Sequence, residues 1–355
     1  MPRQTIRSLL SLNDGPWRWR VGFQAAIAMG LPIALLALAG YPSFGFIASL
    51  GAFTALYGAA LSRHERLRIL PLALIGLVAA SGLGVLGSFN GWLITATLVT
   101  VAALGCLLTL GTPLGPPGPI MLVLVAAVSA DLTAPLAHGG AGMGRFTVPA
   151  LVATGGFVAY LVIIAPLIFP SAWRNRPALP PVAGRRLRRI TLDPTAKAIA
   201  VRVVLAVAIT SLLAAPLGAY RSYWVILTAV AILQSSPTRR LTTTRAFQRV
   251  LGTLLGVVIF AFIAMSEPTA PALIALVVAL QFATEVVVTK NYGLALIFIT
   301  PLALTIYTAG HPGDPFIPIR GRIFDTLFGA GVALLVFWSG EWLRRLKRGS
   351  SVVLG

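Results

Sequence analysis

The stretch YWVILTAVAILQSSPTRRLTTTRAFQRVLGTLLG, residues 223–256, joins two apolar segments through a turn rich in arginine and threonine. The apolar part before Pro237 is too long for an ordinary strand. Thr228 and Gln234 place hydrogen-bonding groups where a helix that faces only lipid would carry none. This pattern indicates two membrane helices, with polar contacts inside the protein, joined by a basic turn.

Composition extends this interpretation to the whole chain. Of its 355 residues 57% are hydrophobic and only 10% are charged. The mean hydropathy of +0.89 is far above that of ordinary water-soluble domains. Runs such as LVLVAAV and LIALVVAL are apolar on every face, whereas strands of a membrane barrel alternate in polarity. We therefore predict an all-α polytopic membrane protein with no soluble catalytic domain.

Breaks at glycine, proline and charged clusters divide the chain into about twelve expected transmembrane helices. The fifth, eighth and eleventh are short or interrupted by proline, so ten or eleven full crossings also fit the sequence. The spans are expected near residues 21–39, 43–61, 68–87, 91–110, 118–136, 146–169, 197–217, 222–236, 246–265, 270–289, 292–309 and 321–343.

The basic residues orient these helices. With the N-terminus inside, all of the 28 Lys and Arg residues except Arg145, Arg221, Arg320 and Arg322 fall on the cytoplasmic side, which predicts cytoplasmic N- and C-termini. We divide the chain into an N-terminal anchor (1–20), a first six-helix repeat (21–170), a cytoplasmic linker rich in proline and arginine (171–196), a second six-helix repeat (197–343) and a basic cytoplasmic tail (344–355).

The expectation of two repeats rests on similar segments in the two halves. YPSFGFIASLGAFTAL at Tyr41 aligns with YRSYWVILTAVAILQ at Tyr220, and each precedes an arginine-rich turn and a helix rich in small residues. Units of six helices enter the membrane in the same sense, so the axis that relates them should follow the membrane normal. We therefore expect a pathway between the halves.

The second half carries a combination of motifs that resembles a known family. A tryptophan, a nearby threonine, a basic turn and the pattern Arg-x-x-Gly-Thr-x-x-Gly are met by Trp224, Thr228, Arg249, Gly252, Thr253 and Gly256. KNYGLALIFITPLALT, with Tyr292, Thr300 and Pro301, and RIFDTLFGAGVA, with Arg322, Asp325, Thr326 and Gly329, extend the match. These residues resemble the fusaric-acid-resistance-like (FUSC-type) membrane proteins, which include bacterial aromatic acid exporters and plant aluminium-activated malate transporters.

The resemblance implies export of small organic anions, such as aromatic or other weak acids, across a bacterial inner membrane. The first half departs from the pattern, with Gly45 where Trp224 would align and Pro71 near Gly252. A site in that half is therefore expected to be degenerate. The expected substrate-binding or pathway residues are Tyr223, Trp224, Thr228, Gln234, Arg245, Arg249, Tyr292 and Thr300.

Ionisable residues inside apolar spans are costly and so become functional candidates. Asp131, Glu285 and Asp325 are candidates for proton coupling. Asp131 fits equally well as a solvated helix end. A salt bridge from Glu285 to an arginine of the basic turn, Arg245 or Arg249, is the favoured structural alternative. Asp325 is expected to pair with Arg322 three residues earlier.

Three other features are ambiguous. Pro301 interrupts a helix, which favours a cavity beside it. Gly252 and Gly256 are expected to permit close helix packing rather than ligand contact. His138 and His311 lie in expected outer loops, where histidines without a role are common.

We predict a secondary exporter, coupled to protons or not. A passive organic-anion channel and a structural or regulatory membrane subunit remain alternatives. An enzyme is not expected, because the chain lacks nucleotide-binding, zinc-protease and serine-triad motifs. The lone Cys106 gives no thiol metal site, so we expect no metal and no cofactor. The expected partners are organic anions and lipids, not nucleic acid, and a monomer and a homodimer both fit.

Overall fold

The structure is a computed structural model, and it describes residues 11–14, 17–169, 191–214, 223–234, 238–311, 313–314 and 316–353. Within these ranges the chain is helical and contains no strand. Nine of the described helices are long and apolar enough to cross a membrane, and the segments 42–56, 120–133 and 223–233 are shorter apolar helices. An all-α polytopic chain is thus confirmed, but twelve crossings are not. Most of the expected linker, 171–196, lies outside the described residues.

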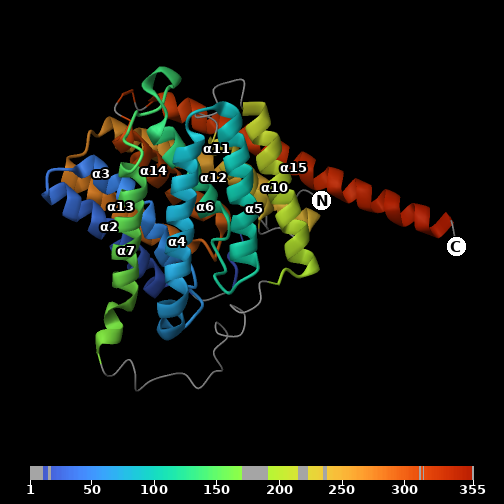
Figure 1. The fold of residues 1–355 in the computed structure, drawn as a ribbon, viewed down its shortest axis with the longest axis horizontal. Coiled ribbons are helices and arrows are strands. Elements are labelled where there is room, and N and C mark those ends of the chain that lie inside the picture. Colours follow the sequence, from blue (N-terminus) through green and yellow to red (C-terminus); the bar gives the residue numbers. More distant parts are fainter. Residues whose placement is uncertain are drawn as a thin grey trace.

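The helices keep the order expected from the sequence (Figure 1). The first half contains α2 (Trp19–Leu38), α3 (Pro42–Ala48), η1 (Gly51–Leu56), α4 (Arg63–Gly87), α5 (Gly91–Leu110), α6 (Ile120–Thr133), η2 (Leu136–His138), α7 (Thr147–Ile164) and η3 (Ala165–Ile168). The second contains α10 (Pro194–Ala214), α11 (Tyr223–Leu233), α12 (Arg239–Met265), α13 (Ala270–Val287), α14 (Tyr292–Gly310) and α15 (Phe316–Val353).

The sequence predicted one long helix over residues 43–61, but the structure does not contain it. The segment forms the seven-residue α3 and then the 3₁₀ helix η1. Glycines let this segment approach its neighbours closely. A Cβ on Gly45 would lie 2.8 Å from the Cα of Ile33 in α2, and a Cβ on Gly51 would collide with the carbonyl of Val152 in α7. Close packing thus takes the place of a regular membrane-spanning helix here.

The basic turn after α11 is shorter than the sequence predicted. Thr238 precedes α12, and its hydroxyl accepts a hydrogen bond of 3.5 Å from the N–H of Leu241, as an N-cap does. The helix therefore begins at Arg239, well before the expected start at residue 246. Arg245 and Arg249 are consequently one helical turn apart on the same helix face.

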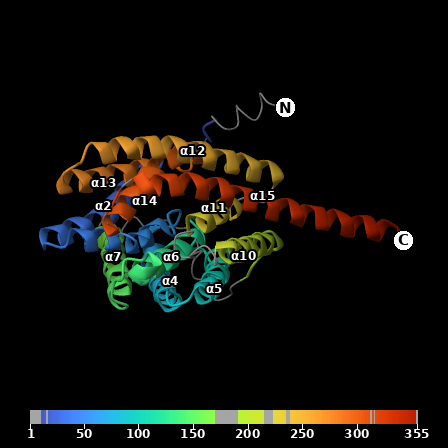
Figure 2. The ribbon, with the colours of Figure 1, turned by 90° about the horizontal axis from the view of Figure 1, so that it is seen from above.

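Helix packing follows the same pattern in the two halves. In the first half α4 packs against α6 and α7, and η1 packs against α7. In the second half α12 packs against α14 and α15, and α11 packs against α15. The first helix of each half also packs against the other half, α2 on α13 and α10 on α5. Figure 2 shows α12, α13 and α15 crossing the direction of α4 and α5.

Glycines make the closest helix contacts possible. A Cβ on Gly84 of α4 would collide with the carbonyl oxygen of Ala126 in α6. A Cβ on Gly252 would meet the carbonyl oxygen of Gly293 in α14, and one on Gly256 would lie 2.6 Å from the Cβ of Thr300. The expected packing role of Gly252 and Gly256 is therefore confirmed.

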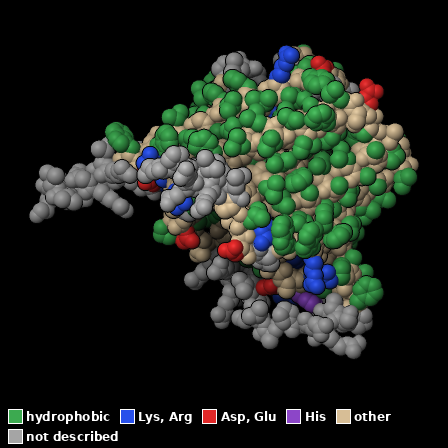
Figure 3. All heavy atoms as spheres, turned by 180° about the vertical axis from the view of Figure 1, so that it is seen from behind, with side chains coloured by type: hydrophobic (Ala, Val, Ile, Leu, Met, Phe, Trp, Pro, Cys, Tyr) green, Lys and Arg blue, Asp and Glu red, His purple; other side chains and the backbone are tan. Residues whose placement is uncertain are grey.

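The outer surface agrees with a membrane setting. Figure 3 shows a face covered largely by hydrophobic side chains, with charged side chains mostly toward its margins. Large apolar side chains such as Phe262, Leu255 and Phe23 are more than half exposed on the helices. Such exposure is expected for lipid-facing residues and would be a liability in water.

Candidate functional site

A cavity of about 540 Å³ lies between the two halves. The first half contributes η1, the start of α6 and the loop before it, whereas the second half contributes α11, α12, α13, α14 and α15. Residues 11, 13 and 18 close part of one end. The main polar and aromatic residues of the wall are Arg18, Trp224, Gln234, Arg245, Gln248, Arg249, Gln281, Thr284, Glu285, Lys290, Asn291, Tyr292 and Arg322.

The charge of this wall is strongly positive. Five basic side chains line it, namely Arg18, Arg245, Arg249, Lys290 and Arg322, whereas Glu285 is the one acidic residue among the described lining residues. Low-dielectric walls strengthen the field of such a group, because water screens it poorly. The cavity is therefore suited to an anion.

Arg322 is the most deeply buried of these cations, with 1% of its surface exposed. Its guanidinium carbon lies 3.9 Å from the ring centroid of Trp224, in a cation–π contact. Nε and Nη1 have no hydrogen-bond partner among the described residues. Asp325 attracts this guanidinium from beyond ion-pair distance and forms no ion pair with it. A buried charge without an ion-pair partner is unfavourable, so this group favours the binding of an anion.

One expectation for Arg322 is wrong. It does not form an ion pair with Asp325, because among the described residues the ion pairs are Arg202–Glu341 and His311–Asp131. Its side chain instead packs on Trp224 in the cavity wall. The spacing of three residues placed Arg322 and Asp325 on one face, but the arginine turns toward the tryptophan.

Arg249 and Arg245 both engage Tyr292 at the start of α14. Arg249 is 4% exposed, and its Nη1 donates a hydrogen bond of 2.9 Å to the Tyr292 hydroxyl. The guanidinium carbon of Arg245 lies 5.0 Å from the centroid of the Tyr292 ring. The three expected pathway residues therefore form one cluster in the wall of the cavity.

Glu285 also lines the cavity, with 8% of its surface exposed. The favoured structural interpretation, a salt bridge to Arg245 or Arg249, is wrong, because no such ion pair forms among the described residues. Both arginines are directed to Tyr292 instead. Glu285 thus keeps a carboxyl group beside the cavity, next to Thr284 and one turn after Gln281.

Of the remaining expected pathway residues, Gln234 lines the cavity and ties the halves together. Its Oε1 accepts a hydrogen bond of 3.2 Å from the backbone N–H of Ile120, the first residue of α6. Such an amide would otherwise be unsatisfied at the helix start. Pro301 lies beside the cavity as expected, because its neighbours Leu302 and Ala303 line it.

Tyr223, Thr228 and Thr300 do not line the cavity. Thr228 is fully buried against α15, where a Cβ on Gly329 would lie 2.8 Å from the Thr228 Cβ. Thr300 is fully buried against Gly256 of α12. These threonines lie within the helix packing that supports the cavity wall.

Part of the N-terminal segment, which the sequence analysis assigned to an anchor and not to the site, lies at the end of the cavity that Lys290 and Asn291 line. The backbone N–H of Asn13 donates to the Lys290 carbonyl at 2.9 Å, and Lys290 Nζ donates to the Asn13 carbonyl at 3.1 Å. Asn291 Nδ2 donates to the Ser11 carbonyl at 3.2 Å. Residues 11–13 are thus held against the loop between α13 and α14.

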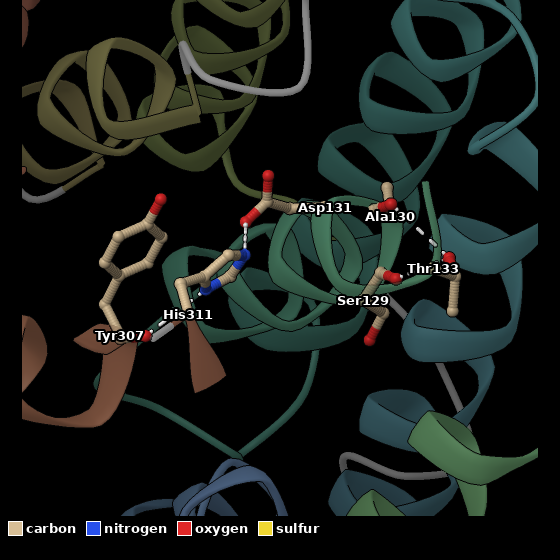
Figure 4. A network of polar contacts seen from close by, with 6 residues as sticks. All are labelled: Ser129, Ala130, Asp131, Thr133, Tyr307 and His311. Carbon is tan, nitrogen blue, oxygen red and sulfur yellow. Dashed lines mark hydrogen bonds and ion pairs between the residues drawn. The ribbon is translucent and has the colours of Figure 1, made fainter. Parts of the chain in front are cut away.

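An ion pair joins the halves beyond the opposite end of the cavity. His311 Nε2, directly after α14, lies 3.1 Å from Asp131 Oδ2 of α6 (Figure 4). The Asp131 side chain is 2% exposed and that of His311 is 17% exposed. Asp131 is therefore not the solvated helix end that one interpretation predicted, and His311 is not an unpartnered loop histidine.

The protonation of His311 depends on this pairing. Burial lowers the pKa of His311, but the hydrogen bond and negative charge of Asp131 and the carbonyl of Tyr307 raise it by more. The pKa therefore lies above the ordinary value, which favours the charged imidazolium. The imidazole ring also stacks on Tyr307, with ring centroids 4.3 Å apart (Figure 4).

A continuous aromatic path connects this pair to the cavity. The rings of Tyr307 and Tyr223 have centroids 6.5 Å apart, and those of Tyr223 and Trp224 are 4.7 Å apart. The Trp224 ring in turn makes the cation–π contact with the Arg322 guanidinium. Bulky side chains therefore separate the deep end of the cavity from the Asp131–His311 pair.

A family model matches the second half of the chain. Residues 201–336 match the family model described as fusaric acid resistance protein-like. The chain is 31% identical over 129 residues to the uncharacterized membrane protein YvaC of Bacillus subtilis, covering 36% of this chain and 20% of that protein. No solved structure matches.

Two further relatives are similar. Over 138 residues the chain is 33% identical to an uncharacterized protein, ORF2, of Neisseria gonorrhoeae, covering 38% of this chain and 31% of the other. Over 112 residues it is 32% identical to an uncharacterized protein of Haemophilus influenzae, covering 31% of this chain and 15% of the other. The matches therefore span less than a third of each relative's length. Residues 201–336 of this integral membrane protein form a fusaric acid resistance protein-like region, as its motifs predicted.

Proposed function

We propose that the protein is a secondary transporter that exports small organic anions, such as aromatic or other weak acids, across a bacterial inner membrane. The observation that carries the proposal is Arg322, a buried cation that forms no ion pair among the described residues and stacks on Trp224 in the wall of a positively charged cavity. The outward direction rests on the family resemblance of residues 201–336.

The chemistry of the wall suits an aromatic carboxylate. A guanidinium donates strong hydrogen bonds to a carboxylate, and Nε and Nη1 of Arg322 have no hydrogen-bond partner among the described residues. Trp224 and Tyr292 offer aromatic faces and edges on which a planar ring packs. The volume of about 540 Å³ falls within the usual range of small-molecule sites.

The proposal includes a duplicated architecture. The matching contacts of α4 and α12, and the reciprocal packing of α2 and α10 on the opposite halves, support two six-helix repeats related about the membrane normal. The first repeat has lost its site in this proposal. Its buried Arg66 is engaged by the Ala55 carbonyl and by Gln24 Oε1, which lies 3.0 Å from Arg66 Nη1.

A carrier is favoured over an open channel. The cavity is bounded at its deep end by Trp224, and Tyr223, Tyr307 and the Asp131–His311 pair lie beyond it. The charged end, with Arg18, Lys290 and Arg245, is the cytoplasmic end by the distribution of basic residues. The described state is thus an inward-facing one in which the exit is closed.

Proton coupling is part of the proposal and has two carriers. Glu285 is the carboxyl group that lines the cavity, and Asp131 is the carboxyl group at the exit. Asp325, the third candidate, is half-buried on α15 and does not line the cavity. Glu285 is therefore placed to exchange a proton as an organic anion enters, and Asp131 as the exit opens.

The direct test uses the full chain in proteoliposomes. Counterflow of labelled benzoate, measured with and without a pH gradient, should show saturable exchange and accumulation driven by the gradient. Exchange without accumulation would remove proton coupling from the proposal. Steady benzoate currents in a planar bilayer, without saturable counterflow, would instead identify a passive channel.

Replacement of Glu285 by glutamine should separate coupling from binding. We expect Glu285→Gln to abolish gradient-driven accumulation of benzoate while equilibrium exchange stays within about threefold of the unmodified chain, because the carboxyl group is lost but the basic wall remains. Thr284→Ala, a change of the adjacent lining residue, provides the matched control. Accumulation that survives Glu285→Gln would exclude Glu285 as a proton carrier.

The exit pair should make transport depend on external pH. The raised pKa of His311 means that the ion pair is complete below the ordinary histidine pKa and is lost as the pH rises through the raised value. We expect slower exchange at pH 6 than at pH 8.5, because the charged pair holds the exit closed. His311→Gln should flatten this dependence. An unchanged pH profile in His311→Gln would contradict the role of the pair.

A further inference from the structure

A second groove lies outside the transport cavity, between α10 and α15. Its volume is about 940 Å³, and side chains from Lys197 to Leu213 and from Leu327 to Gly340 line it. It is almost entirely apolar except at the end where α10 begins. Neither the proposed transport function nor the family match assigns a role to it.

Small residues on α15 make the groove deep. Around Gly331 and Gly340, which both line it, an added Cβ would meet no atom within 4 Å. Leu205 of α10 and Leu335 of α15 are 50% and 63% exposed along its sides. From Lys197 to Leu213 the helix rises by about 24 Å, which is longer than the apolar half of a bilayer, about 15 Å.

The opening of the groove has the features of a membrane–water interface. Nη2 of Arg202 in α10 lies 3.4 Å from Oε1 of Glu341 in α15, so these parts of the two helices are adjacent. Trp338 and Trp342, on either side of Glu341, are 43% and 62% exposed, as tryptophans of an interfacial belt are. The end of the groove near Lys197 is thus at the level of lipid headgroups.

The charge at this opening is positive. Lys197 is exposed, and Arg239 of α12 lies nearby, with its guanidinium carbon 5.8 Å from the centroid of the Trp338 ring. Glu341 offsets Arg202. Asp193, one turn before Lys197, accepts a hydrogen bond from the N–H of Ala196. Lys197, Arg202 and Arg239 thus outnumber Glu341 and Asp193, and the opening keeps a net positive charge. An acyl chain fits the apolar length, and a negatively charged headgroup complements the opening.

We propose that the groove between α10 and α15 is a binding site for an anionic phospholipid, with an acyl chain between the helices and the headgroup phosphate at Lys197. A second copy of the chain is a poorer occupant. Symmetric copies in a membrane share one axis along the normal, so Lys197 of each copy would face the other at the same depth. Such a contact of like charges is unfavourable.

The test measures lipid binding to the purified full chain by native mass spectrometry, with phosphatidylglycerol and phosphatidylcholine of identical acyl chains. We expect phosphatidylglycerol to bind more tightly. Lys197→Gln should weaken its binding about fivefold and leave phosphatidylcholine unchanged, because one basic residue near the headgroup is removed. Arg68→Gln, a change of an exposed arginine on α4, is the matched control and should have no effect.

A second variant tests the apolar part of the site. Gly331→Leu should reduce the binding of both lipids, because the new side chain would occupy the groove from a position where an added Cβ meets no atom within 4 Å. Gly82→Leu is the control, since Gly82 of α4 also has no atom within 4 Å of an added Cβ but lies outside the groove. Size-exclusion profiles should show both variants folded.

Three outcomes would overturn the proposal. Equal affinity for the two lipids would show that the groove has no site for an anionic headgroup. Unchanged lipid binding in Gly331→Leu would show that the lipid binds elsewhere. Efficient disulfide cross-linking of Gly331→Cys between copies, in a Cys106→Ser background, would show that a second chain occupies the groove. The measurement does not depend on transport, so it stands whether or not the proposed export is observed.

Discussion

Replacement of Arg322 by glutamine is expected to weaken benzoate binding and exchange by roughly 30-fold or more. Loss of one partner of a buried, hydrogen-bonded charge pair costs about 2–5 kcal/mol. Arg322 carries this role because it is buried, has free donors, and is not paired with a carboxylate among the described residues. Arg322→Lys should restore only part of the affinity, since an ammonium lacks the planar pair of donors.

The stability of the same variant distinguishes binding from scaffolding. In the absence of an anion, Arg322 is a buried charge that costs free energy, so Arg322→Gln should leave the melting temperature in detergent unchanged or raise it. Benzoate should raise the melting temperature of the unmodified chain more than that of the variant. A strongly destabilised Arg322→Gln chain with unchanged benzoate affinity would mean that the arginine is a structural element. Arg63→Gln, a change of an exposed arginine on α4, is the control.

Replacement of Gly84 by valine is expected to have the largest effect on folding. A side chain at Gly84 would collide with the carbonyl oxygen of Ala126, so α4 and α6 would have to separate along their contact. Overpacking of this kind typically costs 1–3 kcal/mol and occasionally more. We expect about 3 kcal/mol here, because the opposing atom belongs to the backbone and not to a flexible side chain.

Gly82 gives an internal control for this prediction. It lies two residues away on α4, and an added Cβ there would meet no atom within 4 Å. Gly82→Val should therefore stay within about 0.5 kcal/mol of the unmodified chain. Thermal unfolding of both variants in the same detergent provides the comparison. Equal stability of Gly84→Val and Gly82→Val would contradict the close contact of α4 and α6.

Local signals in the sequence correctly identified many of the residues that line the cavity. Trp224, Arg245, Arg249 and Tyr292 belong to the motif-bearing segments of the second half, and all four line the cavity. Glu285 was a candidate because an acid inside an apolar helix is costly, and it lines the cavity as well. The free-energy cost of burying such an acid can be recognised from the sequence of its own helix alone.

The misjudged residues depend on partners far away in the chain. The spacing of Arg322 and Asp325 predicted a local pair, but Trp224 of another helix holds the arginine. The partner of His311 is Asp131 in the other half, which no local pattern indicates. Tertiary contacts therefore decided the roles of both residues.

Short elements were misjudged for a related reason. The segment 43–61 is apolar enough for a membrane helix, yet close packing on α2 and α7 divides it into α3 and η1. Gly45 and Gly51 were the available signal, since glycine weakens a helix and permits close backbone contact. The apolar pattern alone did not show how the segment packs.

The central claim is that organic anions pass through the cavity between the halves. Ala303 lines this cavity and is half-buried, so Ala303→Cys in a Cys106→Ser background places one thiol in the path. In proteoliposomes of the full chain, a bulky maleimide should abolish benzoate counterflow by this variant, and benzoate should slow the labelling. Counterflow that continues unchanged after complete labelling would contradict the account.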